Sequence, residues 1–320
     1  MPRLAIVIPA TGSIASLEAT LVSVLQNRPD DCEVLVVLNQ PYQDPYELRG
    51  EVRFISARPG ADVVACANLG IESAHSSIVH VLAAGYEVAE GWSNAVLRHF
   101  EDHKVGAVAA CVEQPDAATA SAGVGYKAGG KRYLVRQTVS PAKIARTLVA
   151  PAMGAGFYRK AALQSVGGFA REVGPVFADV DTGMAMRAAG YRAVSEPTAL
   201  IQAVESSPAI GTVRKSYYAE RLFWRNAHTA GWVKSLILHV CTLTAEVVSN
   251  LLSIALVGMI AARLLAACQW RHYRRHRQNL AAITRATYIL PAKSGKKQVR
   301  VDRSHAMSSA QGQPQRAKAG

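Results

Sequence analysis

Several common functional motifs are missing from this 320-residue chain. It contains no GxxxxGK[ST] phosphate-binding loop, no GxGxxG dinucleotide motif and no GxSxG nucleophile motif, which argues against the enzyme classes that use them. Its five cysteines are widely spaced, with no CxxC pair and no Cys/His zinc pattern. We therefore expect reduced, buried thiols in a cytoplasmic protein, and no structural metal site.

Acidic residues are scarce at one end of the chain. Between Arg271 and Gly320, twelve Lys and Arg residues accompany a single acid, Asp302, whereas the first 270 residues carry 24 basic and 22 acidic side chains. The net charge of +13 therefore belongs mainly to the terminal segment. A basic segment beside an apolar one is typical of binding to an anionic membrane surface. Nucleic acid is not expected as a partner, because no nucleic-acid-binding motif occurs.

Short apolar runs alternate with segments of helical periodicity through the first 204 residues. The runs predict strands at Leu4–Ile8, Glu33–Leu38, Val52–Ser56, Ser77–Leu82, Val105–Val112 and Ala199–Val204. The periodic segments predict helices at Ser16–Gln26, Ala61–Ala74 and Trp92–His103. This alternation indicates an α/β fold, a doubly wound and mostly parallel sheet with flanking helices, whose ligands bind at the carboxyl ends of the strands. A hairpin is expected around Gly129 and Gly130.

The composition changes after residue 232. Ser235–Ala267 is strongly apolar, and its length meets the requirement of roughly 20 residues for crossing a bilayer. Glu246 and Arg263 argue against a simple lipid-exposed span, because ionisable side chains are costly in hydrocarbon. We therefore favour a membrane-associated hairpin or an interfacial helix. The predicted organisation is a domain at 1–232, an apolar helical segment at 233–270 and a basic, largely disordered tail at 271–320.

The most informative stretch is Gly154–Pro197. It contains an apolar strand, the turn Gly167-Gly168-Phe169, two carboxylates (Asp179 and Asp181) and a helix that ends in AGYR. This order resembles the acceptor-side half of the family 2 (GT-A type) glycosyltransferases. Earlier segments are similar to the same family: LAIVIPATGS, EVLVVLNQP, GADVVACANLGIESA and SIVHVLAAGYEVAEGW. The resemblance covers about residues 4–225 and implies a GT-A fold and a nucleotide-sugar donor.

The chain departs from the family at its polar positions. Leu38 stands where the family has a base-contacting Asp, and Ala83-Ala84-Gly85 stands where an Asp-x-Asp pair holds a divalent metal. Alanine and glycine have no side-chain oxygen for a hard cation, so the sequence argues against a Mg²⁺ or Mn²⁺ cofactor. Glu87 is the nearest carboxylate, either a lone ligand or a surface residue at a helix start. Cations near Arg132, or Arg221 and Arg225, are the alternatives for neutralising a diphosphate.

The resemblance also implies roles for individual residues. Asp179 falls where the family places its catalytic base, which deprotonates the acceptor hydroxyl in an inverting displacement. The alternative is that Asp179 and Asp181 cap the helix Val180–Ala189, and this alternative is favoured for Asp181. The remaining residues expected to bind donor or substrate are Pro9, Asn39, Asn68, Gly70, Asp181 and Arg221.

Two functions remain open from the sequence. The first is a glycosyltransferase at the cytoplasmic face of the cell membrane, which moves a sugar to a glycan or lipid-linked acceptor in cell-envelope synthesis. The second is a catalytically inactive relative that serves as a binding or scaffold subunit of a polysaccharide-synthesis complex. The replacements at Leu38, Ala83 and Gly85, together with Ala178 in place of the family Glu, favour the second.

Overall fold

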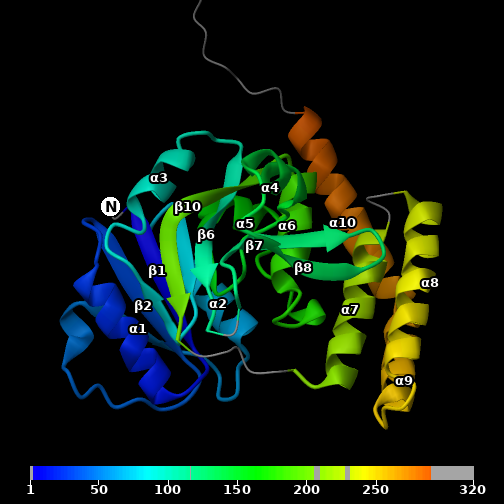
Figure 1. Cartoon of the computed structure of the whole chain (residues 1–320). Coiled ribbons are helices and arrows are strands. Elements are labelled where there is room, and N and C mark those ends of the chain that lie inside the picture. The colour runs from blue at the N-terminus through cyan, green and yellow to red at the C-terminus, as the bar shows by residue number, and fades with distance from the viewer. Residues whose placement is uncertain (1–2, 116, 205–209, 228–230, 290–320) are drawn as a thin grey trace, which may run out of the picture.

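A mostly parallel β-sheet runs through the centre of the protein (Figure 1). The computed structural model describes residues 3–115, 117–204, 210–227 and 231–289, the last five of these by their backbone only. The strand order is β3-β2-β1-β4-β9-β6-β10-β5. The parallel strands are β1 (Leu4–Ala10), β2 (Cys32–Leu38), β3 (Val52–Ser56), β4 (Ile78–Leu82), β6 (Val105–Glu113) and β10 (Arg192–Ala203). Two antiparallel strands join them: β5 (Tyr86–Val88) and β9 (Ala155–Arg159).

Helices cover both faces of the sheet, as the alternating pattern predicted. Along β1, Ala5 and Val7 belong to one hydrophobic cluster and Leu4, Ile6 and Ile8 to another, because successive side chains of a strand point to opposite faces. The first cluster includes α2 (Val63–Ser73), α5 (Lys160–Ser165) and α6 (Ala178–Ala188). The second includes α1 (Ile14–Gln26) and α3 (Asn94–His99). Burial on both faces explains why these strands are continuous apolar runs.

A β-hairpin extends from the sheet toward the C-terminal helices. It consists of β7 (Ser121–Lys127) and β8 (Lys131–Arg136), which confirms the hairpin predicted around Gly129 and Gly130. Gly130 has a φ of +97°, a conformation that glycine adopts without strain. The short helix α4 (Pro141–Thr147) follows the hairpin, and the chain then returns to the sheet in β9.

Four helices complete the described chain on one side of the sheet (Figure 1). They are α7 (Thr212–Asn226), α8 (Trp232–Ser249), α9 (Leu256–Ala267) and α10 (Trp270–Ile289). Among the described residues, α8 alone is long and apolar enough to cross a bilayer, a criterion of length and composition only. The first part of the basic segment 271–320, which was expected to be largely disordered, forms α10 as far as Ile289. Residues 290–320 lie outside the described part.

His80 lies in the middle of β4 and is completely buried. Its ring stacks on Phe157 at 3.9 Å between centroids and contacts Trp92, and its Nδ1 lies 3.1 Å from the carbonyl oxygen of Gly156. Burial lowers the pKa of His80 to about 3, because the charged imidazolium loses its hydration. The folded protein therefore holds this side chain neutral at all moderately acidic pH values.

This shift predicts a pH-dependent stability. Between pH 6.5 and about 3 the unfolded chain binds a proton on His80 that the folded chain does not, so the free energy of unfolding falls as pH is lowered through this window. From pH 6.5 to 5 the expected loss is about 2 kcal/mol. Urea unfolding at both pH values measures it. His80→Phe removes the titrating group, and a variant that loses as much stability as the wild type would contradict the assignment.

Candidate functional site

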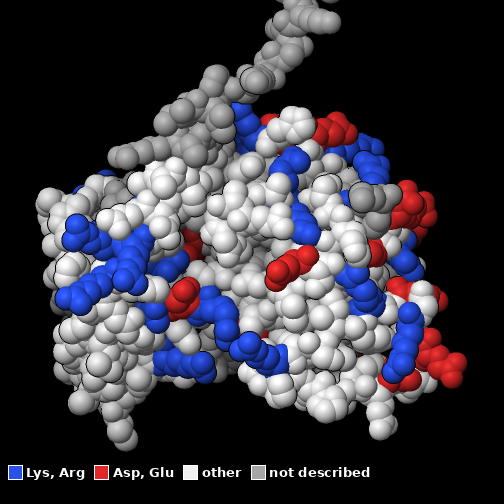
Figure 2. Space-filling model, turned by 180° about the vertical axis from the view of Figure 1, so that it is seen from behind, with Lys and Arg blue, Asp and Glu red and all other residues white. Residues whose placement is uncertain are grey.

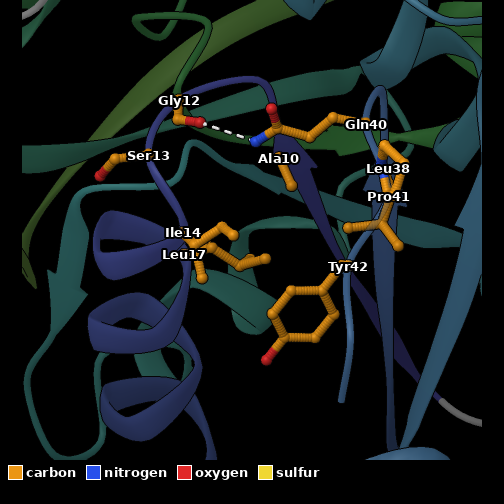
Figure 3. Close-up of a pocket in the computed structure, with 9 residues that line it drawn as sticks. All are labelled: Ala10, Gly12, Ser13, Ile14, Leu17, Leu38, Gln40, Pro41 and Tyr42. Atoms are coloured by element: carbon orange, nitrogen blue, oxygen red, sulfur yellow. Dashed lines mark hydrogen bonds between the residues drawn. The ribbon is translucent and has the colours of Figure 1, made fainter. Parts of the chain in front are cut away.

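The carboxyl ends of β1, β2 and β4 lie together at the lower edge of the sheet in Figure 1. Here a small cavity of about 10 Å³ lies between the first turn of α1 and the segment that follows β2 (Figure 3). Its lining residues are Ala10, Gly12, Ser13, Ile14, Leu17, Leu38, Gln40, Pro41 and Tyr42. Figure 3 shows the ring of Tyr42 lying across from Ile14 and Leu17, so the cavity walls are mostly apolar.

Local hydrogen bonds shape this cavity. Ser13 caps α1, where its hydroxyl accepts a hydrogen bond from the Ser16 N–H at 3.0 Å. The side-chain amide of Gln40 donates to the Gly12 carbonyl at 3.3 Å, which joins the segments after β1 and β2 (Figure 3). The walls are apolar, and at about 10 Å³ the cavity has room for roughly one water molecule.

The segment after β4 lies against the same helix. Gly85 donates its N–H to the carbonyl oxygen of Ser16 and to the hydroxyl of Thr20, at 3.1 and 2.9 Å. The N–H of Ala83 donates to the Gly154 carbonyl at 2.9 Å, and a Cβ on Gly154 would lie 2.9 Å from that of Ala83. The segment is therefore held tightly between α1 and the start of β9.

These residues do not fit a divalent metal. Ala83, Ala84 and Gly85 offer no side-chain oxygen, and the described residues contain no cluster of three or more His, Cys, Asp or Glu suited to an ion. Glu87 lies in β5 opposite Gln202, not at a helix start. Neighbours in a strand point to opposite faces, so Glu87 does not share the face of Tyr86.

Tyr86 follows this segment and lies near the ion pair of Asp179, the predicted catalytic base. Its ring lies beside Gly154, and it is close enough to Arg132 of β8 to influence that guanidinium. Arg132 donates from Nε to Asp179 Oδ1 at 3.1 Å and from Nη2 to Oδ2 at 2.7 Å. Burial opposes the charge on Arg132, but the Asp179 carboxylate outweighs burial and raises the Arg132 pKa. The two-point geometry is the strong form of an ion pair.

Asp179 is the second residue of α6, and its side chain is only 2% exposed. Oδ1 also accepts a hydrogen bond from the Val180 N–H at 2.7 Å. The carboxylate thus contacts a backbone N–H in the first turn of α6 and forms the buried end of a charged pair, but it does not cap the helix, whose N-cap is Phe177.

Asp181 has a different environment from the helix cap that we expected. Arg225 of α7 donates to both of its oxygens, at 2.9 and 2.8 Å, and Asn226 donates to Oδ1 at 3.0 Å. Burial alone would raise the pKa of Asp181, but the charge and hydrogen bonds of Arg225 outweigh it and lower that pKa. Asp181 therefore joins α6 to α7, and its oxygens are fully used.

The other residues expected to bind substrate have mainly structural contacts. Pro9 is buried in β1, and the Asn39 side chain donates to the Ala61 carbonyl at 3.0 Å. Asn68 donates to the Phe169 carbonyl at 2.8 Å and accepts from its N–H at 2.9 Å. A Cβ on Gly70 would lie 2.2 Å from Val7 Cγ1, so this glycine permits α2 to approach β1. Arg221 lies 5.4 Å from the centre of the Tyr217 ring and donates to its hydroxyl at 3.1 Å.

One polar cluster was missed by the sequence analysis. Glu220 of α7 is 4% exposed and accepts hydrogen bonds from Trp224 at 2.7 Å and Arg263 at 2.7 Å, and its Oε1 lies 3.1 Å from His239 Nε2. Arg263 also pairs with Glu246. Hydrogen bonds from His239 and Arg263 outweigh the burial of Glu220 and lower its pKa. The cluster connects α7, α8 and α9.

The same cluster reaches the β7–β8 hairpin. His239 Nδ1 lies 2.9 Å from the carbonyl oxygen of Gly129, and the His239 ring stacks on Phe223 at 3.6 Å. A Cβ on Gly129 would lie 2.7 Å from the Leu238 carbonyl oxygen, so the turn packs directly on α8. The hairpin that carries Arg132 is therefore held at its tip by the C-terminal helices.

Comparison with known proteins supports the fold. No protein-family model and no curated protein matches the sequence. The structure of S. aureus TarS residues 1–349 with UDP-GlcNAc is similar at a TM-score of 0.58, with 11% identity over 90% of each chain. The mannosyltransferase PcManGT from Pyrobaculum calidifontis, with GDP-Man and Mn²⁺, is similar at 0.50, with 17% identity over 90% of this chain and 86% of that one.

A third similar structure is GalNAc-T7 with UDP, GalNAc and Mn²⁺, at a TM-score of 0.53 and 11% identity. The similarity covers 72% of this chain and only 52% of GalNAc-T7. At these identities the likeness shows the fold alone. The chain has the GT-A type fold that its sequence resemblance predicted.

The buried Asp181–Arg225 pair predicts a large loss of stability on removal of one partner. Arg225 and Asp181 are 6% and 3% exposed, so Arg225→Met leaves an uncompensated buried charge and is expected to cost about 3–5 kcal/mol in urea unfolding. The matched control is Arg192→Met, which breaks a pair with Asp102 that is 57% and 45% exposed. That variant should lose little stability, because solvent screens an exposed pair. Equal losses in the two variants would refute this account of the pair.

Proposed function

We propose that this chain is a glycosyltransferase of the family 2 type, which moves a sugar from a nucleotide-sugar donor to a lipid-linked or polysaccharide acceptor. The observation that carries the proposal is the buried Asp179 carboxylate, paired with Arg132 beside the carboxyl edge of a GT-A sheet. The similar structures of TarS and PcManGT contain UDP-GlcNAc and GDP-Man, which supports a nucleotide-sugar donor here.

The reaction we propose is a single displacement with inversion. The acceptor hydroxyl oxygen forms a bond to the anomeric carbon, and the bond from that carbon to the diphosphate oxygen breaks. Asp179 takes the hydroxyl proton, and the bonding electrons leave with the nucleoside diphosphate. The nucleotide base would stack on Tyr42 at the carboxyl edge of the sheet, where the cavity of about 10 Å³ has to widen to admit it. Tyr86 lies close to Arg132, and Arg132 contacts Asp179.

Arg132 gives this reaction a source of positive charge. A diphosphate leaving group accumulates negative charge, and a guanidinium binds phosphate oxygens in the same two-point manner as a carboxylate. In the proposed reaction the donor diphosphate competes with Asp179 for Arg132, and Asp179 becomes free to act as a base. A cation at this position matters more than usual, because the residues after β4 provide no carboxylate for a metal.

The C-terminal helices support an acceptor at a membrane. Leu252 and Ile254, in the segment between α8 and α9, are fully exposed, and Leu251 and Val257 beside them are 66% and 77% exposed. This end of the helix pair points in the same direction as the carboxyl edge of the sheet (Figure 1). We propose that it inserts into the cytoplasmic face of the cell membrane and that the acceptor belongs to cell-envelope glycan synthesis. The basic α10 begins at the other end of α9 and extends away from the inserted end (Figure 1).

The second candidate function is a catalytically inactive scaffold of a polysaccharide-synthesis complex. Two observations favour it: the lack of side-chain oxygens at Ala83–Gly85, and an Asp179 whose two oxygens are both occupied by Arg132. Such a protein keeps the fold and the membrane contact without turnover. Activity of the purified chain separates the two functions.

The transferase predicts a specific effect of Asp179→Asn. The amide keeps the volume of the side chain but accepts no proton, so release of nucleoside diphosphate from a pool of nucleotide sugars, in the presence of bacterial lipid extract, should fall at least about 100-fold. The control is Asp62→Asn, at the N-cap of α2 on the protein surface, which should retain turnover. Both variants are checked for folding by circular dichroism. Wild-type turnover in Asp179→Asn would exclude Asp179 as the base.

A further inference from the structure

A second and larger cavity lies away from the sheet, between α8 and α9. It has a volume of about 330 Å³, within the range of sites that bind organic ligands. Its lining comes mainly from aliphatic side chains of the two helices: Leu243, Val247, Leu256, Met259, Ile260, Leu264 and Ala267. We call this cavity the α8–α9 groove.

The groove follows the whole length of α9. Its lining residues recur every three or four positions from Leu256 to Ala267, so they form one stripe along the helix. Twelve residues of α-helix span roughly 18 Å. A long and narrow apolar groove of this length fits an extended hydrocarbon chain better than a compact ring.

Three charged residues at the wall of the groove are already satisfied. Arg263 pairs with both Glu220 and Glu246, and all three line the cavity. Each of these ionisable side chains therefore has a partner of opposite charge, and Glu220 also has His239 beside it. Their pairing leaves the aliphatic stripe as the surface available to a ligand.

The two ends of the groove differ in character. The Leu256 end lies next to the exposed Leu252 and Ile254, whereas the Ala267 end lies three residues before Trp270 and the start of the basic α10. Arg271 is exposed and lies 5.9 Å from the centre of the Trp270 ring. Figure 2 shows the lower part of the α8–α9 column, at the left of that view, as white surface, with Lys and Arg gathered above it. A ligand that matches both ends has an apolar tail and an anionic head.

Residues 290–320 of the same chain do not have this chemistry. They contain seven Lys and Arg residues and few large apolar side chains, so they match neither the aliphatic stripe nor the basic end. A second copy of the chain would bring its own exposed α8–α9 aliphatics, but also a second basic α10 to the same end. Charge complementarity therefore favours an anionic lipid over both.

We propose that the α8–α9 groove binds one long hydrocarbon chain of a lipid whose phosphate head lies at the basic start of α10. The identification of this lipid as the membrane anchor of the sugar acceptor rests on the proposed function. The lipid binding itself does not rest on the proposed function, because it depends only on the α8–α9 groove and on the arginines at the start of α10. Bound there, the lipid would have its tail toward the exposed Leu252 and Ile254 between α8 and α9, and its head at the start of α10.

Native mass spectrometry of the full chain in detergent, titrated with hexadecyl phosphate and no sugar donor, tests the inference. One bound lipid per chain is expected, together with at least about tenfold weaker binding in Val247→Trp, whose indole fills the groove. The matched control is Val248→Trp on the next position of α8, which is 68% exposed and outside the lining, and should bind within about twofold of the wild type. Ala267→Phe and the exposed Leu265→Phe form a second pair at the other end.

Two results would overturn the inference. One is equal lipid binding in Val247→Trp and Val248→Trp, or in Ala267→Phe and Leu265→Phe, which would place the lipid elsewhere. The other is a dimer that the groove-filling variants alone dissociate, which would make a second copy the occupant. Because no donor is present, this result does not depend on sugar transfer. Lipid binding by a chain that shows no turnover in the Asp179→Asn assay's wild-type control would support the groove and count only against the proposed function.

Discussion

Buried carboxylates, each matched by a cation from another element, determine how this protein is assembled. Asp179 pairs with Arg132, Asp181 with Arg225, and Glu220 with Arg263. A buried charge without its partner is costly, so α6, α7, α9 and the β7–β8 hairpin are restricted to arrangements that keep all three pairs. This constraint fixes the C-terminal helices relative to the sheet. It also gives the exposed end of the α8–α9 hairpin and the carboxyl edge of the strands a common direction (Figure 1).

The fold was largely predictable, and the reason is burial. Strands covered on both faces are continuous apolar runs, so β1, β2, β4 and β6 were recognised from the sequence. The direction of β9 was not predictable, because an apolar run carries no information about which neighbours it pairs with. β9 enters antiparallel between β4 and β6. α10 was not predicted, because its many arginines placed it with the basic segment that was expected to be largely disordered. In the structure Tyr273 is buried, and its Oη donates to the Ala266 carbonyl.

The site was predictable only in part. Asp179 followed from a local pattern, but its partner Arg132 lies 47 positions away and is brought to it by the fold alone. Asn68 and Gly70 belong to a segment that resembles a donor-binding sequence, yet one holds the Phe169 backbone and the other permits helix–strand contact. The Glu220 cluster did leave a signal. Glu246 and Arg263 are isolated charges in an apolar stretch, and such charges normally have partners.

The central claim is that the carboxyl edge of this sheet binds a nucleotide sugar although the segment after β4 lacks metal-binding carboxylates. The most direct test is the melting temperature of the purified chain with a panel of UDP-, GDP- and dTDP-sugars, in Mn²⁺ and in EDTA. A donor that binds the folded state raises this temperature. We predict a rise with one nucleotide class, of equal size in Mn²⁺ and in EDTA. No rise with any donor in a folded protein would contradict the account, and a rise that requires Mn²⁺ would contradict its metal-free site.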